Sequence, residues 1–178
     1  HRDGKDFSPR FVLTHCAVDA TQAEITLEDA MGQLQLTATF VMEAHGVLRV
    51  QYTLRNVGST PYVIDDLHVS LPLPARASEL MDFTGNWARE THPQVHSIMQ
   101  GRHVREVREG RTGHNATHTF IARTECTGFR SGEAWCLSLA WSGNSRYAVE
   151  RTADGSTTLQ AGELLLPGEV VLQPGASY

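Results

Sequence analysis

The stretch QLQLTATFVMEAHGVLRVQYTLRN, residues Gln33–Asn56, decides the fold class because apolar and polar side chains alternate along both of its halves. In the first half, one face of an extended chain carries only apolar side chains: Leu34, Leu36, Ala38, Phe40 and Met42. In the second half, the same holds for Leu48, Val50, Tyr52 and Leu54. The Gly-bearing segment Glu43–Gly46 separates the halves. A period of two on both sides of a short loop predicts a long antiparallel hairpin.

The same period continues on both sides of this hairpin. Before it, AEITLE (Ala23–Glu28) alternates, and after it Tyr62–Leu73 is predicted as one further strand. The turn signals SGN, ADGS and LPG separate most of the strand-like runs of the second half: HVREVRE, ATHTFIA, AWCLSLAWS, SRYAVERT, STTLQAG and EVVLQPG. The segment Pro74–Gln100 has no clean period, and we predict a long loop there with one or two short strands.

No segment carries the capping signals of a helix. Ten or more strands without helices predict an all-β fold, a large antiparallel two-sheet sandwich. We expect residues His1–Tyr178 to form a single domain, and neither end reads like the natural end of a chain, so we expect a fragment truncated on both sides.

The composition excludes several classes of protein. With 40% hydrophobic residues the chain can build a core, and its net charge of −5 disfavours nucleic-acid binding, which needs a basic surface. No apolar run is long enough to span a membrane. The three cysteines, Cys16, Cys126 and Cys136, have no metal-site spacing. They predict buried thiols in a reducing, cytoplasmic location.

The segment GRHVREVREGRTGHNATHTF, Gly101–Phe120, first suggests a phosphate-binding stripe or a metal site. On a strand, however, a spacing of three places Arg102, Arg105 and Arg108 on alternating faces, which favours a solvated strand edge with weak ion pairs. His114 and His118 share a face but are about 13 Å apart along a strand. We therefore expect no metal site and no cofactor.

Four elements, in this order, carry a resemblance to a known family: Trp87–Glu90, Arg105–Asn115, Gly132–Asn144 and Leu172–Tyr178. The order resembles the N-terminal domain of bacterial α-galactosidases of glycoside hydrolase family 36, from about Leu34 to the end of the chain. Thr112, Gly113 and Cys136 depart from the residues usual in that family.

The resemblance implies a β-supersandwich, similar to galactose mutarotase, packed on a catalytic TIM barrel that this chain lacks. Both catalytic Asp residues of this retaining family lie in that barrel, so the resemblance implies no catalytic residue here and an inactive isolated chain. The domain would support the barrel, form a wall of the α-galactoside site and contribute to a homo-oligomer interface, with no nucleic acid or membrane as partner.

Five residues are candidates for contact with substrate, barrel or a neighbouring subunit: Trp87, Arg108, Arg111, His114 and Asn144. Trp87 is favoured because it lies in the irregular middle, whereas Trp135 and Trp141 share a face with Leu137 and Leu139 and are expected in the core. Asn144 suits a left-handed turn position as well as it suits a ligand contact. A stand-alone carbohydrate-binding sandwich remains the alternative function.

Overall fold

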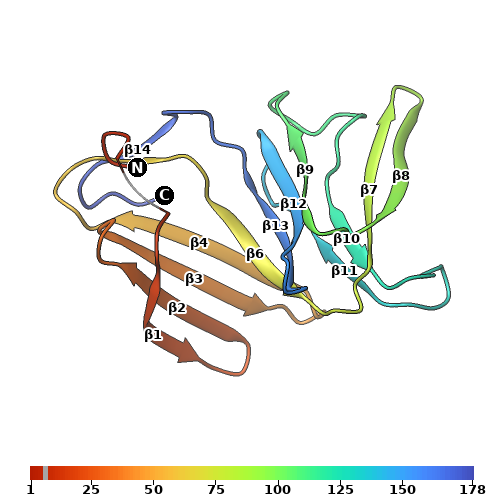
Figure 1. Cartoon of the computed structure of the whole chain (residues 1–178), viewed down its shortest axis with the longest axis horizontal. Coiled ribbons are helices and arrows are strands. Elements are labelled where there is room, and N and C mark those ends of the chain that lie inside the picture. The colour runs from red at the N-terminus through yellow and green to blue at the C-terminus, as the bar shows by residue number, and fades with distance from the viewer. Residues whose placement is uncertain (6–7) are drawn as a thin grey trace. The chain divides into compact units, whose positions relative to one another are not determined.

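The computed structural model describes residues 1–5 and 8–178, which form fourteen β-strands and no helix (Figure 1). All pairings between the named strands are antiparallel. The strands belong to two compact units, which we call the first unit (His1–Asp66 with Leu165–Tyr178) and the second unit (Leu67–Leu164). The predicted all-β, antiparallel fold class is confirmed. Within the described part of the chain, nothing resembles a helix able to cross a bilayer.

The first unit contains a four-stranded sheet in the order β1-β2-β3-β4 and a two-stranded ribbon of β5 and β14. The strands are β1 (Val12–Val18), β2 (Gln22–Asp29), β3 (Leu34–Met42), β4 (Leu48–Asn56), β5 (Tyr62–Ile64) and β14 (Val170–Leu172). β3 and β4 form the predicted hairpin and pair in register from Leu34↔Asn56 to Met42↔Leu48. Gly46 closes its turn with a positive φ of 80°, a conformation that favours glycine.

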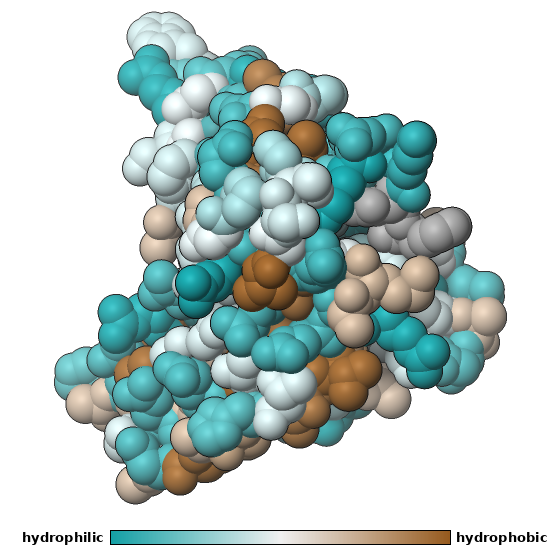
Figure 2. All heavy atoms as spheres, turned by 90° about the vertical axis from the view of Figure 1, so that its left-hand side faces the viewer, coloured by the Kyte–Doolittle hydropathy of each residue, from teal (hydrophilic) through white to brown (hydrophobic). Residues whose placement is uncertain are grey.

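One face of the four-stranded sheet is apolar along β2, β3 and β4. The pairings place Ile25 beside Ala38 and Phe40 beside Val50 on this face. Its Leu34 end is buried, whereas Met42 and Leu48 at the other end of the β3–β4 hairpin are exposed. Apolar side chains also reach the surface elsewhere, and Figure 2 shows one side of the molecule on which they gather in patches among hydrophilic ones.

Asn56 connects the parts of the first unit from the end of β4. Its side chain is completely buried, and all of its hydrogen-bonding capacity is used. Oδ1 accepts hydrogen bonds from Arg2 Nη2 (2.7 Å) and from the backbone N–H of Gly58 (3.0 Å). Nδ2 donates to the carbonyl oxygens of Thr60 (2.8 Å) and Leu172 (2.9 Å). This one amide therefore joins the amino-terminal segment, the β4–β5 loop and β14.

The second unit consists of two four-stranded sheets, in the orders β11-β10-β7-β8 and β6-β13-β12-β9. The strands are β6 (His68–Leu73), β7 (Glu79–Asn86), β8 (Arg89–Ser97), β9 (Gly101–Val107), β10 (Phe120–Arg123), β11 (Ala134–Leu137), β12 (Ser145–Arg151) and β13 (Thr157–Glu163). Core residues from both sheets form a single cluster, in which Leu80 and Phe120 from one sheet meet Tyr147 and Leu159 from the other. The second unit is thus a sandwich in its own right.

Several sequence-based predictions were wrong in this unit. The segment Pro74–Gln100 is not a loop, because β7 and β8 form a long hairpin there. A register shift between Thr84 and Asn86, and the exposure of most of β8, hide the period of two. Residues Tyr62–Leu73 form two strands, β5 and β6, which belong to different units.

Two predictions about burial also fail. All three cysteines are free and exposed, so the prediction of buried thiols was wrong. Trp135 packs against the core as expected, but Trp141 lies beyond the end of β11 and is 49% exposed.

The hydrogen bonds of Asn56 give a testable prediction. Asn56→Ala should lower the free energy of unfolding by about 2–4 kcal/mol, because several buried polar groups lose their partners at once. Gln51→Ala, at an exposed position on the same strand, should change it by no more than about 0.5 kcal/mol. Urea unfolding of the two variants provides the measurement, and equal effects would contradict the role assigned to Asn56.

Candidate functional site

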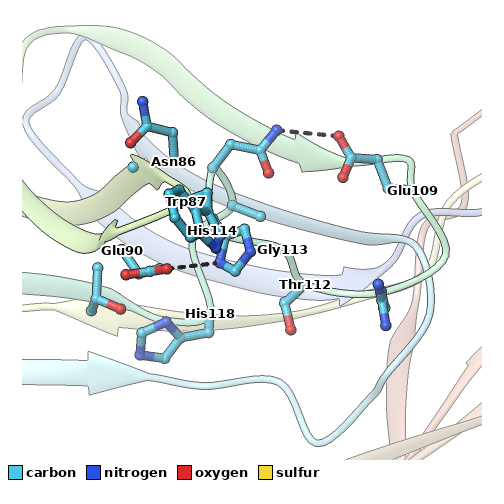
Figure 3. Close-up of a pocket in the computed structure, with 13 residues that line it drawn as sticks. Asn86, Trp87, Glu90, Glu109, Thr112, Gly113, His114 and His118 are labelled. Atoms are coloured by element: carbon cyan, nitrogen blue, oxygen red, sulfur yellow. Dashed lines mark hydrogen bonds and ion pairs between the residues drawn. The ribbon is translucent and has the colours of Figure 1, made fainter.

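A pocket of about 760 Å³ lies in the second unit, between the tip of the β7–β8 hairpin and the loop that joins β9 to β10 (Figure 3). The hairpin tip contributes Trp87 and Glu90, and the β9–β10 loop contributes His114. The other residues of its lining are Gly85, Asn86, Thr91, Glu109, Arg111, Thr112, Gly113, Asn115, Ala116 and His118. Two segments that are at least 18 positions apart in the sequence therefore form opposite walls.

The hairpin tip has an unusual backbone. Ala88 and Thr91 adopt positive φ values of 64° and 53°, which are uncommon for residues with a Cβ atom. Gly85 has a φ of 156°, and a Cβ atom there would lie 2.3 Å from the carbonyl oxygen of Arg89. Such strained conformations concentrate at functional sites, which makes the tip a candidate for one.

Glu90 holds this tip together and links it to the opposite wall. Its carboxylate accepts a hydrogen bond from the backbone N–H of Ala88 at 3.0 Å. Its Oε1 also lies 3.6 Å from Nδ1 of His114, an ion pair when the imidazole is protonated (Figure 3). Backbone N–H groups of Glu90 itself and of Ala88 hold the pKa of this carboxyl below its usual range, and His114 adds to the effect.

The β9–β10 loop is fixed at both of its ends. At its start, the backbone N–H of Gly110 donates to Oδ1 of Asn144 at 2.9 Å. Near its end, Arg105 Nη2 donates to the carbonyl oxygen of Asn115 at 3.3 Å. Within the loop, Nδ2 of Asn115 donates to Oε1 of Glu109 at 3.2 Å (Figure 3). The pocket wall is therefore attached to strand β9 and to the residue preceding β12.

Arg105 also reaches the interior of the sandwich. Its Nη1 lies 3.2 Å from Oδ2 of Asp82, whose side chain is completely buried. Arg105 pairs with the core residue Tyr147, so its side chain points to the inner face of β9. The predicted alternation of the arginines is correct, but the predicted solvated edge is wrong for Arg105. Its ion pair with Asp82 neutralises a charge that would otherwise be buried alone.

The five candidate residues separate into two groups. Trp87, Arg111 and His114 line the pocket together, although Arg111 follows Trp87 by 24 positions in the sequence. Arg108 instead forms an ion pair with Glu106, with distances of 2.8 and 2.9 Å. Asn144 does not line the pocket, and it has no positive φ, so it does not hold the left-handed turn position; its side chain supports the loop through Gly110.

Sequence reasoning did not single out Glu90 and His118 as pocket residues. Glu90 belongs to the element Trp87–Glu90, and His118 belongs to the segment Gly101–Phe120. Only the folded hairpin and loop bring the two residues to one cavity. The ring of His118 stacks on Phe83 at 5.2 Å between centroids, which places this histidine at the floor between loop and strand.

The pocket has the chemistry of a polar binding site with one aromatic platform. The indole of Trp87 is 83% exposed, and an exposed aromatic face can stack against the apolar side of a sugar or against another protein. The surrounding carboxylate, imidazole and amide groups can form hydrogen bonds with hydroxyl groups.

Residues 2–173 match the family model for the glycosyl hydrolase family 36 N-terminal domain. The chain belongs to this family. Among curated proteins, an α-galactosidase of Escherichia coli is 35% identical over 173 residues, which cover 97% of this chain and 24% of the relative. A probable α-galactosidase C of Aspergillus terreus is 25% identical over 163 residues, which cover 89% of this chain and 22% of the relative. The chain thus spans about a quarter of the length of the relatives it matches.

Solved structures show the same fold. An α-galactosidase of family GH36 from Geobacillus stearothermophilus superposes with a TM-score of 0.83 at 20% identity, over 99% of this chain and 27% of that one. The galactosidase domain of an α-galactosidase-sucrose kinase superposes with a TM-score of 0.86 at 18% identity, again over 99% of this chain and 27% of that one. The resemblance inferred from the ordered motifs is confirmed.

The buried ion pair beneath the pocket gives a second prediction. Arg105→Met should lower the free energy of unfolding by about 3–5 kcal/mol, because it leaves the carboxylate of Asp82 buried without a partner. Arg108 directly follows the end of β9 and forms an exposed ion pair with Glu106. Arg108→Met should therefore lower the free energy of unfolding by less than about 1 kcal/mol. Chemical denaturation of both variants tests this, and a small effect at Arg105 would show that Asp82 is stabilised in another way.

Proposed function

We propose that the chain acts as the non-catalytic N-terminal domain of an α-galactosidase, in which the remaining three-quarters of the enzyme hydrolyse terminal α-galactosides. The single observation that carries this proposal is the family match over residues 2–173, combined with coverage of only 24% of the E. coli relative. The rest of such an enzyme would hold the two catalytic Asp residues of a retaining mechanism.

We further propose that the pocket around Trp87 faces the rest of the enzyme or a neighbouring subunit of a homo-oligomer. Three features support this. The indole is exposed on a hairpin tip, the wall opposite is held firmly by Asn144 and Arg105, and the lining mixes an aromatic platform with polar groups. Exposed tryptophans that become buried on association commonly carry a large share of the binding energy.

The apolar face of the first unit supports the same role. Met42 and Leu48 lie at the exposed end of an otherwise apolar sheet face, and such a surface suits contact with a further domain. The three free cysteines agree with a reducing, cytoplasmic location, which we include in the proposal.

The proposal predicts that the isolated chain does not hydrolyse p-nitrophenyl α-galactoside. It also predicts activity in a chimaera in which this chain replaces the matching segment of the E. coli α-galactosidase. A chromogenic assay of both proteins tests these expectations. Hydrolysis by the chain alone, or a folded chimaera without activity, would contradict the proposal. Calorimetric binding of galactosides by the isolated chain would favour the carbohydrate-binding alternative, since the pocket would then act without the rest of an enzyme.

The role of the pocket has its own test in the same chimaera. Trp87→Ala should lower kcat/KM, or weaken subunit association, by about tenfold, the effect expected when a buried interface side chain worth roughly 1.4 kcal/mol is lost. Trp141→Ala is the matched control, because Trp141 is also partly exposed in the second unit but does not line the pocket. Steady-state kinetics measures kcat/KM, and sedimentation velocity measures subunit association. Similar behaviour of the two variants would argue against a functional pocket.

A further inference from the structure

We propose that Asp82, His96 and His103 form a binding site for one divalent transition-metal ion, with Zn²⁺ as the preferred ion. The site lies in the second unit, where β7, β8 and β9 each contribute one of these residues. It is separate from the pocket around Trp87, whose lining includes none of the three. It also does not depend on the proposed function of the chain.

The three side chains can offer their ligand atoms to a common point. One atom from each residue lies within 4.8 Å of the others. Nε2 of His103 is 3.8 Å from Oδ2 of Asp82, and the rings of His96 and His103 are 4.4 Å apart between centroids. In a tetrahedral zinc site, bonds of about 2.0–2.2 Å place ligand atoms about 3.3–3.6 Å apart. Small side-chain rotations are enough to reach that geometry.

Strand pairing explains why these three residues converge. His96 lies opposite the core residue Leu80, which is two residues from Asp82 on β7, so both side chains point to the inner face of their sheet. His103 lies opposite the core residue Val149 on β12, so it points to the inner face of the other sheet. The ring of His103 also stacks on Phe120 at 6.0 Å between centroids, within the sandwich.

The observation that carries the proposal is a set of buried polar atoms without partners. Oδ1 of Asp82, Nε2 of His96 and Nε2 of His103 are each inaccessible to solvent and form no hydrogen bond. Buried polar atoms in folded proteins are nearly always satisfied, and leaving one unsatisfied costs about 1–3 kcal/mol. Asp82 is completely buried, so solvent cannot compensate its carboxylate. A single metal ion bound between the carboxylate of Asp82 and the two imidazoles would neutralise the carboxylate and give both nitrogen atoms a partner.

The surrounding contacts prepare these atoms as ligands. Nδ1 of His96 lies 3.4 Å from the carbonyl oxygen of Ser97, which can only accept, so this contact favours a proton on Nδ1 and a free lone pair on Nε2. Arg105 contacts Oδ2 of Asp82 at 3.2 Å, which orients the carboxylate and leaves Oδ1 available.

A cavity of about 200 Å³ lies beside the two histidines. Its lining includes His96 and His103, together with the β8–β9 connection from Ser97 to Arg102. Three protein ligands would leave the fourth position of the ion to water, as in other zinc sites with three protein ligands. Imidazole ligands favour Zn²⁺ over Mg²⁺ or Ca²⁺, which prefer sites made of oxygen atoms. The positive charge of Arg105 favours weaker binding than in a closed four-ligand site.

The experiment measures Zn²⁺ binding to the chain by equilibrium dialysis and calorimetry. Cys16, Cys126 and Cys136 are replaced by Ser first, because these exposed thiols could bind the ion adventitiously. We expect one Zn²⁺ per chain and no binding of Mg²⁺. H96Q and H103Q should each weaken Zn²⁺ binding at least tenfold. H92Q is the matched control, because His92 lies on the same strand as His96 but is exposed, and it should bind Zn²⁺ as the parent does.

Spectroscopy of the protein with all of its histidines intact tests the site even when a histidine variant does not fold. Co²⁺ in place of Zn²⁺ should give the visible absorption of a tetrahedral site. In NMR spectra, Zn²⁺ should shift the imidazole resonances of His96 and His103 while those of the exposed His45 and His92 stay in place. Failure to bind Zn²⁺, undiminished binding in both H96Q and H103Q, or shifts confined to exposed histidines would each overturn the proposal.

Discussion

The guanidinium group of Arg105 sets the charge balance inside the second unit. Asp82 is a completely buried carboxylate between two sheets, and Arg105 contacts it at 3.2 Å, whereas the imidazole of His103 lies further away at 3.8 Å. Removing a carboxylate from water costs several kcal/mol, so the fold depends on this partner being held in place. The pairing of β9 with β12 holds Arg105 in place, because this pairing directs its side chain to the inner face beside Tyr147.

The same side chain connects the interior to the pocket. Through its second terminal nitrogen, Arg105 donates to the carbonyl oxygen of Asn115, and Asn144 fixes the other end of the loop through Gly110. The wall that carries His114 is therefore attached to the sandwich at two points. A binding surface that is organised in advance loses less entropy when it meets a partner, and this suits the proposed role of the chain beside a catalytic domain.

The first unit is joined around a buried side chain that is itself neutral. Asn56 uses every hydrogen-bonding position of its amide to join the amino-terminal segment, the loop after β4 and β14. A buried neutral group needs partners but carries no charge to neutralise, so four hydrogen bonds are sufficient there. The contrast shows two ways in which an all-β protein joins segments that are far apart in its sequence.

The sequence by itself determined the all-β fold class, the β3–β4 hairpin and the family, because alternation and turn chemistry depend on neighbouring residues and ordered motifs are read along the chain. It also identified Trp87, Arg111 and His114 as candidates. Only the tertiary structure decided that these three line one pocket, that Pro74–Gln100 is a hairpin, and that Asp82 meets Arg105 and two histidines. The bulge near Gly85 and the positive φ values of Ala88 and Thr91 hid the hairpin. The other contacts depend on how two sheets pair and pack, and residues on separate strands meet through that packing, which no local pattern along the chain records.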